Sequence, residues 1–190
     1  MLPLMMLNMY MSNHCVHLNL NMNPVTIEHS KLKNAYQTTI PIVDLNPNLI
    51  SILNKCNIKV TYAESFYSSP AFTQPIHTDN LGGDYAKLNY VFGGAGSQMH
   101  WYKVKEGVSS STKCFTPDEG TVFLPWEPNM VDLVQSDALS YPSLVQVGCP
   151  HNVTNPNEYR LCIALVLLDG NHFQRISLAS AKNKLAQYVV

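Results

Sequence analysis

The sequence predicts a single domain with an all-β core and flanking helices. Its 190 residues are the length of one ordinary domain. Only 13% of them are charged and 12 are proline, which favours short strands and turns over long solvated helices. From Ile58 onward, eight or so short β-forming runs alternate with Gly and Pro turns, and no helical segment separates them. This pattern is typical of a barrel or a double-sheet jelly roll, not of a parallel α/β sheet.

The chain divides into three regions on this basis. Residues 1–57 form an N-terminal extension with one clear helix, for which Asn46 is the expected N-cap and Pro47 the first helical residue. Residues 58–169 form the β core, and residues 170–190 a tail whose end, Leu178–Tyr188, is expected to be helical. The main expected strands are Ile58–Phe66, Lys87–Phe92, Gln98–Val104, Thr121–Leu124, Met130–Val134, Ser143–Val147 and Tyr159–Leu168, with turns at Gly93–Gly96 and Pro117–Gly120.

Charge and cysteine content exclude several classes of partner. The net charge of −1, without any basic cluster, argues against duplex nucleic acid and anionic membranes. Five scattered cysteines without a CxxC pair indicate free thiols in a reducing compartment. The apolar start, Met1–Met11, lacks a basic region and is too short to span a bilayer. We therefore expect a cytoplasmic protein.

One short motif carries the strongest chemical signal. His77 and Asp79 lie two residues apart, so in an extended strand their side chains point to the same face. A third ligand must come from elsewhere, and His151 is the best candidate. Two histidines and one carboxylate, with open positions opposite, form the ligand set of non-haem Fe(II) oxygenases. These three residues are the predicted metal ligands and the predicted catalytic centre.

Arg160 adds a second chemical feature. Its apolar neighbours Leu161 and Ile163 indicate a buried strand, and a buried guanidinium requires an anion. The fixed fork of donors suits a carboxylate. The turn-forming residues 152–157 predict a hairpin that pairs the strand of Arg160 with the strand of His151.

The ordered set of His-x-Asp, a distal His and an Arg nine positions later resembles the 2-oxoglutarate/Fe(II)-dependent dioxygenases. The resemblance covers roughly Tyr62 to Asp169 and is closest to short oxygenase-like proteins of phages and marine bacteria. The stretches that carry this closer likeness are Lys87–Tyr90, Trp101-Tyr102, Pro142–Val145 and Pro150–Asn155.

The resemblance implies a double-stranded β-helix, that is, a cupin-like jelly roll. It implies Fe(II), 2-oxoglutarate as co-substrate and O2, with ascorbate as an optional reductant. The implied reaction hydroxylates a small molecule or a protein side chain and releases succinate and CO2. A substrate of this kind is the expected partner, in the cytoplasm or, for a phage protein, in the host cytoplasm.

The resemblance also assigns co-substrate residues. Arg160 would pair with the far carboxylate of 2-oxoglutarate. Asn89 and Tyr90 are candidates for its near side, and strand alternation lets only one face inward, of which we favour Asn89. Cys162 stands where the family often has Ser or Thr. Because a thiol is a weak donor, co-substrate affinity is lower or a tyrosine compensates.

Other interpretations of these residues remain open. The chain could be a non-catalytic jelly roll whose metal site is absent, degenerate or structural, or a cupin-like enzyme that needs no Arg160. A Cys149–His151 nucleophile pair lacks an oxyanion motif, and His100 is either a pocket wall or a substrate contact. The tract from His14 to His17 resembles a metal cluster, but a polar loop or short edge strand is the expectation.

Overall fold

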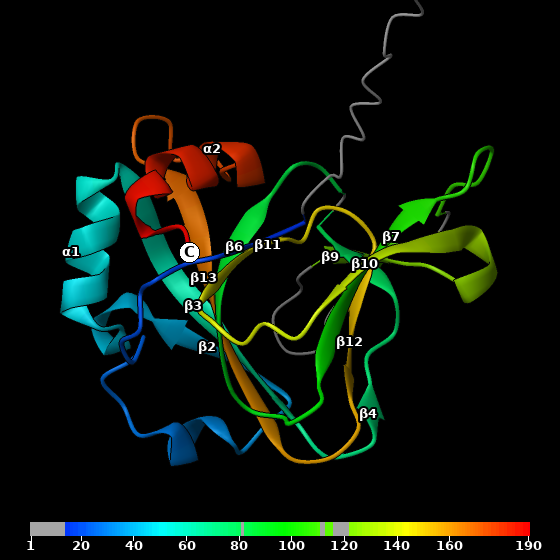
Figure 1. Cartoon of the computed structure of the whole chain (residues 1–190), viewed down its shortest axis with the longest axis horizontal. Coiled ribbons are helices and arrows are strands. Elements are labelled where there is room, and N and C mark those ends of the chain that lie inside the picture. Colours follow the sequence, from blue (N-terminus) through cyan, green and yellow to red (C-terminus); the bar gives the residue numbers. More distant parts are fainter. Residues whose placement is uncertain (1–13, 81, 111–112, 116–121) are drawn as a thin grey trace, which may run out of the picture.

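The computed structural model describes residues 14–80, 82–110, 113–115 and 122–190. The apolar start at 1–11 and the turn expected at 117–120 lie outside these ranges. The described residues form two antiparallel sheets and two α-helices (Figure 1). No helix among them has the length and apolar character needed to cross a membrane.

The strands are β1 (Cys15–His17), β2 (Gln37–Pro41), β3 (Ile58–Ser68), β4 (Phe72–Thr73), β5 (His77–Asp79), β6 (Ala86–Gly93), β7 (Gln98–Val104), β8 (Cys114–Phe115), β9 (Val122–Pro125), β10 (Val131–Asp137), β11 (Ser143–Gln146), β12 (His151–Asn155) and β13 (Arg160–Asp169), and the helices are α1 (Pro47–Lys55) and α2 (Leu178–Lys184).

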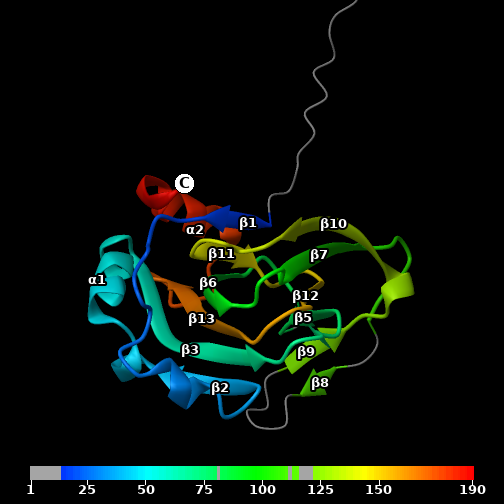
Figure 2. The same ribbon diagram turned by 60° about the horizontal axis from the view of Figure 1, so that its bottom comes forward.

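The two sheets face each other, as Figure 2 shows. The first sheet has the order β1-β11-β6-β13-β3-β2, and the second has the order β10-β7-β12-β5-β9-β8, with β4 pairing β12. Successive strands repeatedly change sheet: β5, β7 and β12 belong to the second sheet, whereas β6, β11 and β13 belong to the first. The all-β core predicted from the sequence is confirmed at this level.

The first sheet separates two environments. On its outer face, apolar side chains of β6 and β13 join the core built with α1 and α2. On its inner face, alternate residues of the same strands point toward the second sheet, because side chains two apart share a face. These inner residues include Lys87, Asn89 and Arg160, all buried. The sheet therefore places polar and charged groups in the space between the two sheets.

The local predictions are largely confirmed. The Asn46 side chain accepts a hydrogen bond from the Asn48 amide at 2.9 Å, and α1 begins at Pro47. The strand Gln98–Val104 has the expected bounds, and glycines with positive φ form the turn before it. The tail helix is shorter than expected, since α2 ends at Lys184 and a 3₁₀ turn, Ala186–Tyr188, follows. The N-terminal extension contributes both edge strands of the first sheet. β1 matches the edge-strand alternative given for the tract His14–His17, whereas the weak periodicity did not predict β2.

The predicted hairpin between the strands of His151 and Arg160 is wrong. β12 pairs with β4, β5 and β7, whereas β13 pairs with β3 and β6 in the other sheet. The intervening loop crosses between the sheets and is held by Asn155. The buried Asn155 amide donates to the carbonyls of Ser69 at 2.8 Å and Glu158 at 2.7 Å. These two hydrogen bonds hold the loop in place of the backbone hydrogen bonds that a hairpin would have formed.

Candidate metal centre

β5 and β12 bring the three predicted ligands together. His151 lies directly opposite His77 on the antiparallel strand, and Asp79 follows on the same face. Thr78 points the other way, where its hydroxyl accepts a hydrogen bond from Trp126 Nε1 at 2.8 Å. Asp79 Oδ1 is 3.4 Å from His77 Nε2 and 3.9 Å from His151 Nε2. One ligand atom from each residue lies within 4.8 Å of the others, so the group can surround a metal ion.

Both imidazoles are oriented by backbone carbonyls. His77 Nδ1 is 2.9 Å from the Pro75 carbonyl, and His151 Nδ1 is 2.9 Å from the Cys149 carbonyl. A carbonyl only accepts, so each Nδ1 carries a proton, and in its neutral form each ring presents its Nε2 lone pair to Asp79. Two lone pairs and a carboxylate oxygen that face one another form a site for a cation. In metal sites, the histidine nitrogen that does not bind the metal is usually hydrogen-bonded in this way.

The electrostatics keep Asp79 and His151 in their ligand forms. Burial by itself would raise the pKa of Asp79, but the Lys87 ammonium and the two histidines hold it well below its usual value. Burial, together with the neighbouring His77, lowers the pKa of His151 to about 4. At neutral pH the site therefore offers an ionised carboxylate and an unprotonated His151.

A buried cation beside the site was missed by sequence reasoning. Lys87 Nζ lies 2.7 Å from Asp79 Oδ2 and 2.6 Å from Glu64 Oε2. Lys87 thus occupies one oxygen of Asp79 and leaves the other, Oδ1, to the histidines. The available signal was alternation, because Lys87 lies two residues before Asn89, the residue predicted to face inward.

The same pocket contains three of the predicted co-substrate residues: Arg160, Asn89 and Cys162. Arg160 is 5% exposed, and its Nε has no hydrogen-bond partner. No acidic group of the described chain lies within ion-pair distance of its guanidinium. Cys162 contacts that guanidinium, and burial raises the pKa of its thiol. The Asn89 Oδ1 is also buried without a partner. Gly94, at φ 72°, lies where a Cβ would come within 2.8 Å of the Arg160 side chain.

Tyr90, the other predicted co-substrate residue, is not part of this pocket. It packs in the outer core, and its hydroxyl donates to the Leu20 carbonyl at 3.1 Å. The assignment of Tyr90 to the co-substrate is corrected for that reason. Tyr36, just before β2, is a tyrosine that does line the pocket, at its exposed side. It comes from the N-terminal extension, and the sequence did not single it out among the tyrosines.

Two further candidates fall outside the catalytic interpretation. Cys149 meets His151 through its backbone carbonyl, and burial raises the pKa of its thiol to about 12. An unactivated thiol of this kind is a poor nucleophile. His100 is bonded to Ser136 at 2.7 Å and Thr154 at 3.0 Å, and it does not line the pocket.

Two comparisons with known proteins give no match that would indicate the role of the site. A scan against protein-family models finds no match for this chain, and a search of curated proteins finds none. The fold and the site define a β-rich protein with a candidate metal centre in a pocket between two sheets.

Proposed function

We propose that this chain is a 2-oxoglutarate- and Fe(II)-dependent oxygenase with a double-stranded β-helix fold. Strand order supports the fold. The four central strands of the first sheet, β11, β6, β13 and β3, face β10, β7, β12 and β5 of the second, and the chain passes from one set to the other at every step except between β7 and β10, which pair with each other. Such alternation is what two intertwined Greek keys produce.

The observation that carries the proposal is the placement of the three ligands beside Arg160. His77, Asp79 and His151 present two nitrogens and one carboxylate oxygen from two adjacent strands. This donor set suits Fe(II), with positions left open on the side of the pocket. Arg160 lines the same pocket with an unpartnered Nε, so the pocket is built to accept an anion.

Charge balance supports the pairing of a divalent cation with a dicarboxylate. Asp79, Lys87 and Arg160 line the pocket, and the buried Glu64 pairs with Lys87 beside it, which makes two acids and two bases. A divalent cation alone would leave two uncompensated positive charges in a buried space. A dianion such as 2-oxoglutarate restores neutrality, so each should raise the affinity of the other.

Each residue then has a distinct role. His77, His151 and the Oδ1 of Asp79 would hold Fe(II), while Lys87 keeps Oδ2 engaged and the carboxylate monodentate. Arg160 orients the far carboxylate, and Asn89 is placed for the near end of the co-substrate. Bound Fe(II) supplies the activation of O2 that is coupled to decarboxylation of the 2-oxo acid. The substrate class is a small molecule or a protein side chain.

The metal assignment is tested by Asp79→Ala. This variant should lose at least 100-fold in Fe(II) affinity, measured anaerobically by calorimetry on the folded protein. Asp132→Ala is the control, since Asp132 forms only a surface ion pair with Lys105 at 3.6 Å. Stoichiometric Fe(II) binding with unchanged affinity in Asp79→Ala would refute the ligand assignment.

The co-substrate assignment is tested by Arg160→Met. In the wild-type protein, 2-oxoglutarate added to the Fe(II) form should give a metal-to-ligand absorption in the visible, and air should then give succinate. Arg160→Met should weaken 2-oxoglutarate binding at least 10-fold and leave Fe(II) binding intact. The control is Arg175→Met, because Arg175 lies outside the pocket. Unchanged 2-oxoglutarate binding in Arg160→Met would instead favour a metal enzyme with another co-substrate.

One observation favours a second candidate function, a non-catalytic binding protein. Lys87 already gives Asp79 a buried cationic partner, so the pocket is partly neutralised without a metal. Such a protein would bind an anionic ligand through Arg160 and turn nothing over. Failure of the wild-type protein to bind Fe(II), together with retained binding of 2-oxoglutarate, would select this candidate.

A further inference from the structure

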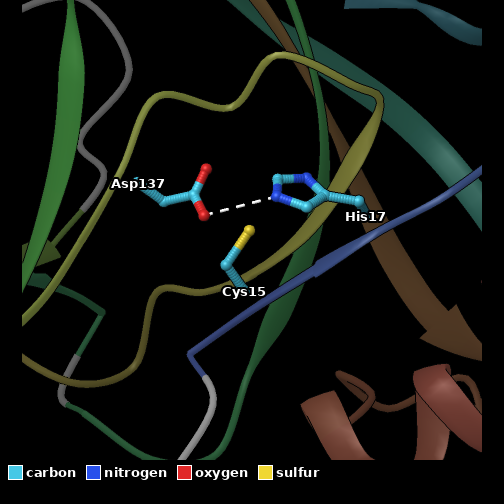
Figure 3. A group of neighbouring side chains, drawn as sticks. All are labelled: Cys15, His17 and Asp137. Carbon is cyan, nitrogen blue, oxygen red and sulfur yellow. Dashed lines mark ion pairs between the residues drawn. The ribbon is translucent and has the colours of Figure 1, made fainter. Parts of the chain in front are cut away.

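A second group of metal-ligating side chains lies on the edge strand β1, away from the pocket. Cys15 and His17 share one face of β1, and Asp137 approaches them from the end of β10. One ligand atom from each lies within 4.8 Å of the others. Figure 3 shows the His17 ring and the Asp137 carboxylate pointing at each other, with the Cys15 sulfur directed toward the space between them. We call these three residues the edge cluster.

The hydrogen bonds around His17 fix which of its ring nitrogens carries a proton. The Ser143 hydroxyl has a single proton, which it donates to the Tyr141 carbonyl at 2.7 Å. It can therefore only accept from His17 Nδ1, which lies 2.8 Å away. In the neutral ring, Nε2 then presents a lone pair to Asp137 Oδ2 at 3.3 Å. A lone pair that faces a carboxylate oxygen at this distance is unfavourable, and either a proton on Nε2 or a cation bound by both atoms would relieve it.

The Asp137 carboxylate is oriented in the same way. Its Oδ1 accepts a hydrogen bond from the Leu139 amide at 2.7 Å, which leaves Oδ2 to face His17. His17 and Asp137 are thus each oriented by a hydrogen bond to the atom that faces away from the other ligand. Metal ligands in proteins are commonly held in this way. The side chains of His17 and Asp137 are 33% and 25% exposed, so an ion can enter from solvent.

The donor set identifies the ion. A thiol sulfur, an imidazole nitrogen and a carboxylate oxygen suit Zn²⁺, with a fourth position for water. Ligand atoms of a tetrahedral zinc site are about 3.3 to 3.7 Å apart. The pair of His17 and Asp137 already has this spacing, and a small movement would bring in Cys15. Binding would release the thiol proton to solvent.

A catalytic Cys-His-Asp arrangement fits less well. The Cys15 side chain is 4% exposed, and burial raises the pKa of its thiol to about 12, with Asp137 acting in the same direction. Such a thiol is not a nucleophile. A bound divalent metal, in contrast, deprotonates a coordinating thiol outright.

We propose that Cys15, His17 and Asp137 bind a zinc ion that fastens the edge strand β1 to the end of β10. The proposal is independent of the pocket and of any oxygenase activity. It also changes the interpretation of the His14–His17 tract, which the sequence alone favours as a loop or edge strand. The tract is an edge strand, and its missing third ligand lies far along the chain at Asp137.

Cobalt is the direct probe, because Co²⁺ bound to a thiolate gives an intense sulfur-to-metal absorption in the near ultraviolet. The metal-free full chain should show this band on titration, saturating by two equivalents because the pocket can also take Co²⁺ without contributing a sulfur band, and excess Zn²⁺ should remove it. Cys15→Ser should abolish the band. Cys56→Ser should keep it, since Cys56 is a half-buried thiol outside both groups.

Two further variants separate this site from the pocket. Asp79→Ala should keep the band, because the three pocket ligands, His77, Asp79 and His151, include no sulfur. His17→Gln replaces a partly exposed side chain and should weaken Co²⁺ binding at least 10-fold even if Cys15→Ser folds poorly. An ordinary ion pair with protonated His17 predicts no band in the wild type. That result, or a band that survives Cys15→Ser, would overturn the proposal.

Discussion

The pocket triad (His77, Asp79 and His151) and the edge cluster have the same arrangement of candidate ligands, but different neighbouring groups hold those ligands in place. Each has two ligands two residues apart on a strand, His77 with Asp79 and Cys15 with His17, and a third from another strand. In each, histidine Nε2 faces a carboxylate oxygen. The two sites differ in the neighbouring groups that orient the ligands. It teaches that one local spacing can give a candidate metal site either in a buried pocket or at a sheet edge.

The pocket triad is supported by a buried cation and by backbone. Lys87 holds Asp79, and two carbonyl oxygens hold the histidines. The edge cluster has no lysine or arginine among its described partners and relies on the Ser143 hydroxyl for His17. The pocket ligands are therefore held by a buried charge and by backbone carbonyls, whereas the edge cluster is held by one hydroxyl and one backbone amide.

The largest expected effect comes from removal of the pocket cation. Lys87→Met leaves Glu64 and Asp79 buried without their shared partner, which should cost about 3–5 kcal/mol in the free energy of unfolding. Lys105→Met is the control, since its ion pair with Asp132 is exposed and should contribute less than about 1 kcal/mol. Urea denaturation of the metal-free proteins measures both. Equal stabilities of the two variants would show that the pocket charges are not a preassembled support.

A slightly smaller loss in the free energy of unfolding is expected when the pH is lowered. The His151 pKa is lowered from 6.5 to about 4 in the folded protein, so the unfolded state binds the proton more readily. Its contribution is complete above pH 6.5 and is lost as the pH falls from 6.5 to 4, by as much as about 3 kcal/mol. Metal-free wild type should lose this stability across the window, and His151→Asn should not. Parallel pH profiles for the two proteins would contradict a neutral buried His151.

Local spacing explains which parts of the site were predictable. Strand alternation has a period of two, so His77 with Asp79, and the preference for Asn89 over Tyr90, follow from neighbouring residues alone. The helix cap at Asn46 is equally local. These features are encoded within a few residues of one another, and the structure places them as the sequence indicates.

Long-range pairing explains what the sequence did not reveal. The position of β12 and β13 in different sheets depends on pairings with strands far along the chain. Lys87 meets Glu64 and Asp79 only because three strands from two sheets converge. Asp137 reaches His17 for the same reason. Apart from the alternation that relates Lys87 to Asn89, no local pattern distinguishes these residues from ordinary surface charges, so their contacts emerged only from the fold.

The smallest expected effect distinguishes the two supports directly. Ser143→Ala removes the hydroxyl that orients His17 and should lower Co²⁺ affinity at the edge cluster about 10-fold, or about 1.4 kcal/mol. Ser136→Ala is the matched control, because it removes an equivalent Ser–His hydrogen bond, to His100, outside both groups. Neither change should alter Fe(II) binding in the pocket, whose histidines are held by carbonyls that no side-chain substitution removes. Unchanged Co²⁺ affinity in Ser143→Ala would mean that β1 itself, and not the hydroxyl, fixes the ring.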